Sequence, residues 1–317
     1  MLLQTFSSTS SSTSISPGAL VHLGLQAAAA LFQVPSDTFV QQLPMIAPLP
    51  QSPAEVALRK SVDELLDESM EPWASRPGYP IFDDDDEDCN IVNTKMQRFS
   101  IKTSDGNVGD AQQQRTPATY GEITSVGARQ LFYHMGLTTT TTGNEHSKEE
   151  DEEIVFVDLG SGRGKLILQA FMELPILSKA VGIELAPQRH ATAVSAWTDL
   201  QSTAKELRSG RSQETTTEAT VEFLNEDLLE VDLSKVTHIY MASLCFPDAL
   251  MHHIAAKLEE NAPNLKCLAT LRKFETSPKL ASKTIGFQHR TEYIDMTWTQ
   301  ESSRGCPTFV YTKAPLA

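Results

Sequence analysis

Near its middle, this 317-residue chain reads Ile154-Val-Phe-Val-Asp158-Leu-Gly160-Ser-Gly162-Arg-Gly164-Lys165. The apolar run Ile154–Leu159 has the length and composition of a buried parallel strand. The glycines after it let the backbone approach a ligand closely, and the helix predicted over Leu166–Leu174 begins with unpaired N–H groups. The segment therefore predicts a strand, a ligand-binding turn and a helix.

The spacing of these glycines separates the kinds of ligand that such turns hold. A dinucleotide fingerprint, Gly-x-Gly-x-x-Gly, would need glycine at Lys165. A Walker loop needs four residues between its first glycine and a Gly-Lys-Ser/Thr ending, whereas Gly160 stands at the wrong distance and Leu166 follows the lysine. Neither site is predicted. Glycine-rich turns also occur only to pack a helix on a strand, and that alternative stays open.

Strands and helices alternate on both sides of this turn. Further strands are predicted over 180–184, 221–224, 238–241 and 267–271, and further helices over 187–207 and 248–260. Two longer strands, 291–299 and 308–312, surround a turn at 305–307. Such alternation indicates a parallel sheet covered on both faces. We therefore expect an α/β, Rossmann-like fold with a mostly parallel seven-stranded sheet, helices on both faces and a C-terminal antiparallel hairpin.

The pattern Asp-x-Gly-x-Gly-x-Gly resembles the first motif of S-adenosylmethionine-dependent methyltransferases. In that family the acid at the strand end lies near the amino-acid part of the cofactor, and the glycine backbone packs against it. The resemblance assigns the ribose hydroxyls to Glu184, after the second strand, and the adenine amino group to Asp227, after the third. It implies the class I methyltransferase fold and a cofactor site that includes Asp158, Gly160, Ser161, Gly162 and Gly164.

A second resemblance rests on segments that flank the turn in the chain. Thr119-Tyr120-Gly121-Glu122-Ile-Thr124 precedes it, and Ser243-Leu-Cys-Phe246-Pro247 follows the fourth strand. Together with Val157-Asp-Leu-Gly-Ser-Gly they resemble the disruptor-of-telomeric-silencing family, the histone-lysine methyltransferases without a SET domain, over about Tyr120 to Thr312. The resemblance implies that Tyr120, Glu122 and Thr124 cover the methionine moiety. It implies that the rest of the cofactor site is lined by Asp158, Gly160, Lys165, Glu184, Asp227 and Leu228.

The methyl-transfer site departs from that family in two places. The family has two asparagines where this chain reads Ala242-Ser243, and glutamine in place of Lys165. Ser243 is therefore the stand-in expected at the transfer site, and Tyr120 and Phe246 are the other catalytic candidates. A lysine acceptor must be neutral to attack, and a dry channel lowers its pKa by desolvation. The candidate channel walls are Tyr120, Tyr240, Phe246 and Trp298.

The N-terminal third has a different composition. The first 58 residues contain no Lys or Arg and open with a Ser/Thr tract. Residues 1–110 are expected to be largely disordered or loosely ordered, and the acidic run at 83–88 reads as a solvated linker. The methyltransferase domain is expected over 115–315, with its first helix within 121–137. A short amphipathic helix is predicted near 54–70, with Val56, Leu58, Val62, Leu65 and Leu66 near helical spacing.

Charge and composition narrow the set of partners. Lys and Arg number 26 and Asp and Glu 41, so the net charge is −15. A chain this acidic does not neutralise phosphate, and no sequence-specific nucleic-acid binding is expected. The apolar stretch at 19–34 is too short and too polar for a membrane span. The cysteines at 89, 245, 267 and 306 form no Cys-x-x-Cys pair, so no metal site is predicted.

Three functions remain open. The first is an S-adenosylmethionine-dependent protein-lysine methyltransferase that acts on the nucleosome core and so regulates chromatin. The acidic surface and Ala242-Ser243 favour a second, a methyltransferase of the same fold that acts on a non-histone protein or a small molecule. The third is a scaffold that binds the cofactor without catalysis. The resemblance implies the nucleus, while the cytoplasm or a plastid are the alternatives, since a plastid leader tolerates the Ser/Thr tract.

Overall fold

The computed structural model describes residues 52–74, 91–92, 94–95, 121–138, 153–209, 219–274, 287–299 and 305–313. The predictions for the tract before residue 52, for the acidic run at 83–88 and for Tyr120 lie outside these residues. No helix in the described ranges is both long and apolar enough to cross a membrane.

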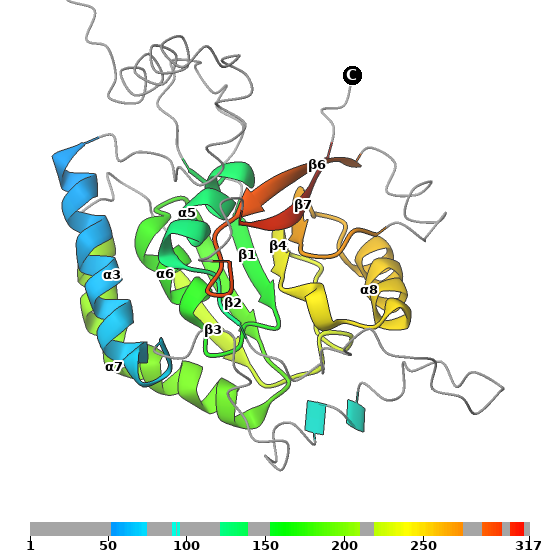
Figure 1. Cartoon of the computed structure of the whole chain (residues 1–317), viewed down its shortest axis with the longest axis horizontal. Helices are drawn as coiled ribbons and strands as arrows, with labels where there is room; N and C mark the ends of the chain where they lie inside the picture. Colours follow the sequence, from blue (N-terminus) through cyan, green and yellow to red (C-terminus); the bar gives the residue numbers. More distant parts are fainter. Residues whose placement is uncertain are drawn as a thin grey trace, which may run out of the picture.

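A seven-stranded sheet lies at the centre of the protein (Figure 1). In chain order its strands are β1 (Ile154–Leu159), β2 (Leu177–Ile183), β3 (Thr220–Leu224), β4 (His238–Met241), β5 (Cys267–Thr270), β6 (Phe287–Ile294) and β7 (Cys306–Lys313). Across the sheet the order is β3-β2-β1-β4-β5-β7-β6. The first five strands are parallel, and β7 is antiparallel to both β5 and β6. The predicted mostly parallel sheet with a C-terminal hairpin is confirmed.

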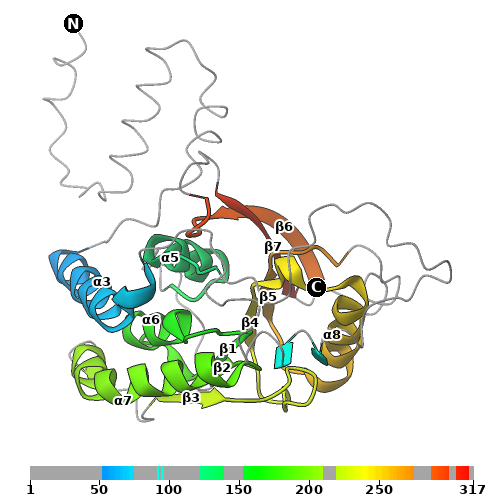
Figure 2. The ribbon, with the colours of Figure 1, turned by 60° about the horizontal axis from the view of Figure 1, so that its bottom comes forward.

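Helices cover both faces of this sheet (Figure 2). Because side chains alternate along a strand, Phe156 of β1 packs into one core cluster and Val155 and Val157 into another. The first cluster lies under α5, α6 and α7, and the second under α8. A 3-10 turn, η1 (Ser243–Cys245), follows β4. The helices are α5 (Ser125–His134), α6 (Lys165–Glu173), α7 (Pro187–Ser209) and α8 (Asp248–Asn261).

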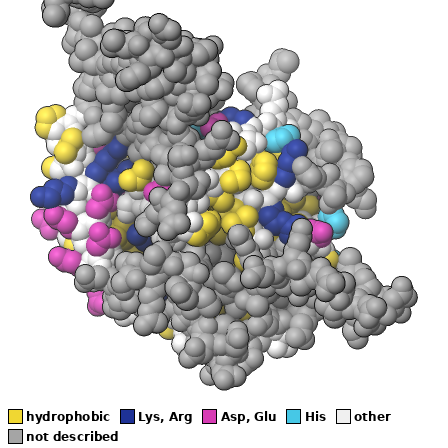
Figure 3. All heavy atoms as spheres, viewed as in Figure 1, with side chains coloured by type: hydrophobic (Ala, Val, Ile, Leu, Met, Phe, Trp, Pro, Cys, Tyr) yellow, Lys and Arg dark blue, Asp and Glu magenta, His cyan; other side chains and the backbone are white. Residues whose placement is uncertain are grey.

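An N-terminal helix, α3 (Pro53–Ala74), packs against α6 and α7 (Figures 1 and 2). Leu58, Val62 and Leu66 recur every four residues and are buried in the first core cluster. The predicted helix near 54–70 is therefore confirmed, although Val56 is 52% exposed. Acidic side chains gather along the α3 edge of the molecule (Figure 3), where Glu64, Asp67 and Glu68 are exposed.

Two segments differ from the sequence-based expectations. The first hairpin strand ends at Ile294, so the prediction of a strand through to residue 299 is wrong. Instead Met296 forms an isolated antiparallel bridge with Ile123, just before α5. The helix predicted within 121–137 spans only Ser125–His134, and its Val126 is 40% exposed. The helix turns Gly127 towards the core instead, because the carbonyl of Asp295 lies where any larger side chain would be.

Candidate functional site

Chain order reverses across the sheet between β1 and β4. From β1 the chain moves outward through β2 and β3, and then returns to β4 on the other side of β1. At such a reversal the carboxyl ends of the strands leave a crevice in which ligands bind. The glycine turn follows β1, and the segment with Ser243 and Phe246 follows β4, so both lie at this crevice. A Cβ added to Gly160 would be 3.9 Å from the ring of Phe246, which confirms that the two segments are neighbours.

The turn after β1 has a backbone that glycine adopts readily and other residues do not. Gly160, Gly162 and Gly164 have φ angles of 94°, 55° and 82°, in the left-handed region. The amides of Gly160 and Ser161 both donate to the carbonyl of Ile183, at 2.8 and 2.9 Å. These bonds fix the turn to the end of β2.

Two glycines of the turn differ in what they allow: one permits close packing of a helix, and the other leaves backbone exposed. A Cβ added to Gly164 would lie 2.5 Å from the ring of Phe223, so this glycine lets α6 approach β3 closely. Gly160 is exposed, although Leu159 and Ser161 on either side of it are buried. The backbone at Gly160 is therefore open to a ligand inside an otherwise enclosed turn.

Asp158 is a buried carboxylate at the end of β1. It is 4% exposed and lies between Gly182 of β2 and Tyr240 of β4. Among the described residues, neither its Oδ1 nor the hydroxyl of Ser161 has a hydrogen-bond partner. Burial, and then the nearby Glu184, raises the pKa of Asp158 well above its usual range. An unpaired buried acceptor costs about 1–3 kcal/mol, so the site is arranged for a donor that a ligand brings.

Glu184 follows β2 and holds the glycine turn from the other side. It is 6% exposed, and its two carboxylate oxygens accept from the amides of Gly162 and Ala186 at 2.8 and 2.9 Å. Each oxygen has a second lone pair, so the carboxylate can still accept from a hydroxyl. The side chain of Asn225 donates to the Glu184 carbonyl at 2.8 Å, which ties the end of β2 to the turn after β3.

Asp227 lies after β3 with its side chain 9% exposed. Its Oδ1 accepts from the amide of Leu229 at 3.1 Å, and its Oδ2 is 3.8 Å from the Lys95 ammonium. Leu228 beside it is half-buried against the core cluster under α8. Asp158 near the end of β1 and Glu184 and Asp227 after β2 and β3 thus lie at the carboxyl ends of three adjacent parallel strands, as the resemblance implied.

The pre-α5 segment (Gly121–Thr124) is tied to the glycine turn by an ion pair. Arg163, 4% exposed inside the turn, donates to the Glu122 carboxylate at 2.9 Å. The backbone of Glu122 bonds to Thr297, both through its amide, at 3.2 Å, and through its carbonyl, at 2.9 Å. The ring of Trp298 lies against Gly121 and leaves no room for a Cβ there. The segment is therefore held between the turn and residues 295–299.

Thr124 closes the pre-α5 segment as the N-cap of α5. Its hydroxyl accepts from the amide of Gly127 at 3.0 Å and donates to the Asp295 carboxylate at 2.7 Å. Side-chain caps of this kind stabilise a helix start by about 1 kcal/mol. The hydroxyl of Thr124 therefore anchors the segment.

Ser243 and Phe246 have different surroundings after β4. Ser243 is fully buried, and its hydroxyl lies 2.6 Å from that of Thr270 and accepts from the amide of Arg272 at 3.0 Å. The guanidinium of Arg272 donates to the carbonyl of Phe246 and to Asp248. Ser243 thus ties η1 to the end of β5, whereas the ring of Phe246 lies half-buried beside Gly160.

The remaining candidates also divide between the crevice and the core. Tyr240 is 3% exposed within the core cluster under α5 and α6, so it packs in the core. Trp298 is half-buried beside the pre-α5 segment, and Lys165 is the half-buried first residue of α6. Sequence reasoning missed Arg163 and Asp295. A charged residue between two glycines of a turn expected to be enclosed was a signal for Arg163, whereas nothing in the sequence indicated Asp295.

The residues at the crevice fit S-adenosylmethionine. Asp158 offers a buried acceptor that has no partner among the described residues, and Gly160 offers open backbone. Glu184 and Asp227 offer carboxylates further along the same edge of the sheet. This sheet order, with an acid after each of the first three strands, defines a class I S-adenosylmethionine-dependent methyltransferase. Residues 110–284, more than half of the chain, match the family described as histone methylation protein DOT1. The chain belongs to that family, the one that its sequence resembles, and S-adenosylmethionine is its cofactor.

Two solved structures of methyltransferases are distantly similar to part of this chain. The Salinibacter ruber RNA methyltransferase in complex with S-adenosyl-L-homocysteine is 18% identical over 60% of this chain and 92% of its own, with a TM-score of 0.35. The Bacillus subtilis m1A22 tRNA methyltransferase TrmK is 13% identical over 56% of this chain and 67% of its own, with a TM-score of 0.36. Similarities of this size say nothing about the substrate of this chain. No curated protein matches it.

Proposed function

We propose that this protein transfers a methyl group from S-adenosylmethionine to a lysine side chain of a histone in the nucleosome core. Family membership supports the reaction and the histone as its substrate. One structural observation supports the proposal for the site: three carboxylates lie at the carboxyl ends of three adjacent strands beside the glycine turn, and a buried oxygen of Asp158 has no hydrogen-bond partner among the described residues. A nuclear location and a part in chromatin regulation follow if the acceptor is the nucleosome.

Each carboxylate has a proposed part of the cofactor to hold. Asp158 would accept from the amino group, Glu184 would use its remaining lone pairs for the ribose hydroxyls, and Asp227 would accept from the adenine amino group. Hydrogen bonds to an ionised acceptor are about twice as strong as neutral ones. Bound there, the cofactor supplies a methyl group on a positively charged sulfur. The turn formed by Gly160, Ser161, Gly162 and Gly164 would lie beside it, with its exposed backbone at Gly160.

The pre-α5 segment would close over the methionine part of the cofactor. We assign Tyr120 and Glu122 to that cover, and Thr124 to its support as the N-cap of α5. Lys165 and Leu228 would border the site from α6 and from the turn after β3. The ion pair between Glu122 and Arg163 supports this assignment, because it already holds the segment against the glycine turn.

The protein's own part in the transfer is alignment and desolvation. An amine attacks only without its proton, and surroundings poor in water lower its pKa. Alignment of the two reacting groups supplies much of the rate enhancement in such displacements. Phe246 and Trp298, both half-buried, are the proposed channel walls together with Tyr120. Ser243 would act through η1, by fixing the backbone that carries Phe246.

The surroundings of Ser243 favour a second candidate acceptor. The Ser243 hydroxyl is engaged with Thr270 and Arg272, so Ala242 and Ser243 offer the crevice no side-chain amide like those of the family's asparagines. A lysine held by different contacts, on a non-histone protein, would suit such a site.

Calorimetry on the full chain tests the cofactor site first. We expect saturable binding of S-adenosylmethionine and of S-adenosylhomocysteine, weakened about tenfold in Asp227→Asn by loss of a charge-assisted hydrogen bond. Glu226→Gln is the matched control, because Glu226 is exposed and adjacent. An equal loss of cofactor affinity in both variants, or no loss in either, would contradict the assignment of Asp227.

Transfer of radiolabelled methyl groups then identifies the acceptor. The proposal predicts label in a core histone when nucleosomes are offered, and a lysine site by mass spectrometry. Label only in other proteins of a lysate would favour the second candidate. Cofactor binding without transfer to any protein would mean that the fold retains the site without the reaction.

A further inference from the structure

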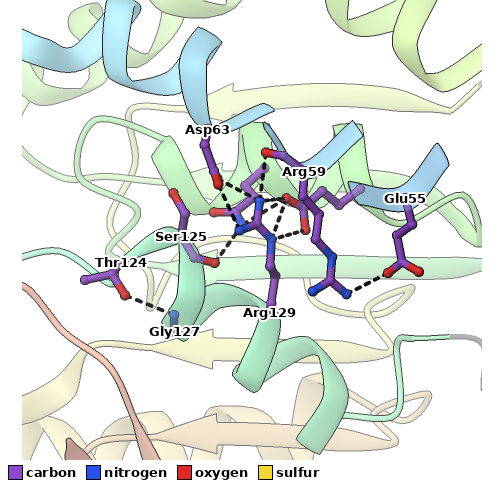
Figure 4. Close-up of polar contacts among 9 residues, drawn as sticks. Glu55, Arg59, Asp63, Thr124, Ser125, Gly127 and Arg129 are labelled. Carbon is purple, nitrogen blue, oxygen red and sulfur yellow. Dashed lines mark hydrogen bonds and ion pairs between the residues drawn. The ribbon is translucent and has the colours of Figure 1, made fainter. Parts of the chain in front are cut away.

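Arg129 of α5 is a buried arginine that connects three helices (Figure 4). It is 6% exposed. Its guanidinium donates to Glu173 of α6 at 2.6 Å and to Asp63 of α3 at 2.7 Å. It also donates to the backbone carbonyl of Arg59 at 3.2 Å. The acceptors of this cation therefore come from the N-terminal helix as well as from α6.

Both carboxylates stabilise the charge of Arg129. Burial opposes the charged guanidinium, but its hydrogen bonds to Asp63 and Glu173 outweigh burial and raise the pKa of Arg129. Burial also raises the pKa of Glu173, and the contacts of Glu173 with Arg129 offset this increase only in part. Removal of one partner from such a buried pair leaves charge without compensation. Asp63, whose side chain is 39% exposed, gives Arg129 a second carboxylate from α3, beside the one that Glu173 supplies from α6.

The same contacts determine how α5 lies on α6 at the site. The side chain of Gln169 on α6 donates to the carbonyl of Ser125, the first residue of α5, at 2.9 Å. The chain enters α5 from the pre-α5 segment and enters α6 from the glycine turn. The ion pair of Glu122 with Arg163 therefore lies at the amino ends of the two helices that Arg129 joins. A shift of α5 along α6 would separate that pair.

We propose that α3 is a positioning element of the cofactor site, which acts through Asp63 and Arg129 on the pre-α5 segment. Leu58, Val62 and Leu66 bury the helix against the core and so place Asp63 beside Arg129. The effect on the cofactor rests on the proposed function, whereas the effect on the segment does not. The functional unit then begins at or before α3, and not near residue 115 as composition indicates.

Asp63→Asn in the full chain tests this role, because the variant removes the charge and keeps the shape of the side chain. We expect faster amide hydrogen exchange over residues 121–127, where the amide of Gly127 is bonded to the Thr124 hydroxyl. We expect the Kd for S-adenosylhomocysteine to rise about fivefold or more. Asp63→Glu, which retains the carboxylate, should largely restore both values. Glu64→Gln is the control, because Glu64 is exposed and pairs with the exposed Lys60.

Unchanged exchange over residues 121–127 together with an unchanged Kd, in an Asp63→Asn chain that is folded by circular dichroism, would overturn the inference. A lower melting temperature alone, without either change, would show that α3 only adds stability, and it would overturn the inference too. Failure of the parent chain to bind S-adenosylhomocysteine would instead count against the proposed function. The exchange measurement needs no cofactor, so it would still decide whether α3 positions the segment.

Discussion

Asp158 is the residue at which stability and binding conflict. Burial, and to a smaller extent the charge of the nearby Glu184, raises the pKa of Asp158 in the folded protein well above the usual range. A carboxyl group with a raised folded pKa favours the folded state at low pH, and this contribution is lost as pH rises from about 4 through the raised pKa. The unliganded protein is therefore destabilised by this residue near neutral pH, and a bound donor would relieve the cost.

Asp158→Asn should separate the two effects. Because the amide does not titrate, we expect the free energy of unfolding at pH 7 to rise by about 1 kcal/mol or more. The decline of this free energy between pH 5 and pH 8 should also be shallower than in the parent. Urea unfolding measures both. Cofactor affinity, by calorimetry, should fall by about tenfold or more. Asp199→Asn, on the exposed side of α7, is the control. A variant less stable than the parent at pH 8 would contradict this account.

Gly164 combines a left-handed backbone with close packing. Gly164→Ala would place a methyl group 2.5 Å from the ring of Phe223 at a φ of 82°, and we expect a loss of about 2–4 kcal/mol from strain and overpacking together. Gly136 has a φ of 75° with nothing within 4 Å of its added Cβ, so Gly136→Ala reports the backbone strain alone. Thermal unfolding of both variants gives the packing contribution by difference. Equal losses would mean that Phe223 moves aside freely.

At the scale of elements, one ion pair joins the glycine turn to the pre-α5 segment. In a double-mutant cycle of Arg163→Gln and Glu122→Gln, we expect a coupling free energy of about 1–3 kcal/mol in thermal or urea unfolding. The exposed pair of Lys179 and Glu222, with side chains 41% and 43% exposed, should couple by less than about 1 kcal/mol. Coupling of the same size in both pairs would show that Arg163 gains nothing from its burial.

The elements that sequence predicted well are those whose signal is local. The strand at Ile154–Leu159, the turn after it and the helix that follows are fixed by neighbouring residues. The expected strand over 291–299 failed, because the bend after Ile294 depends on Asp295 and Thr297, which pair with Thr124 and Glu122 at the amino end of α5. The burial of Ser243 likewise depends on its contact with Thr270, which lies 27 residues away in the chain. Such contacts leave no periodic trace in the sequence.

At the scale of the whole molecule, α3 attaches part of the N-terminal third of the chain to the core. Acidic side chains dominate the exposed surface of α3, whereas Leu58, Val62 and Leu66 form a continuous buried stripe. Full burial of each such side chain contributes about 1.5–3 kcal/mol. The helix was therefore predictable from periodicity, and its attachment to α6 and α7 was not.

Removal of residues 1–109 should lower the stability of the remainder by on the order of 5 kcal/mol, because the apolar surface under α3 becomes exposed and Arg129 loses Asp63. Differential scanning calorimetry would show this as a lower melting temperature. A chain that begins at residue 50 keeps α3 and is the control. If the two truncated chains have the same melting temperature, α3 contributes no stability.

The contacts of the pre-α5 segment also set an order of events during synthesis. Thr124 and Asp295 are 171 residues apart, and Glu122 and Thr297 are 175 apart. A growing chain on the ribosome can form the strands and helices that follow the glycine turn as they emerge, but it cannot anchor the segment until residue 297 has been made and released. The nascent chain can therefore form its five parallel strands before the pre-α5 segment is anchored, and the anchoring waits for residues 295–297.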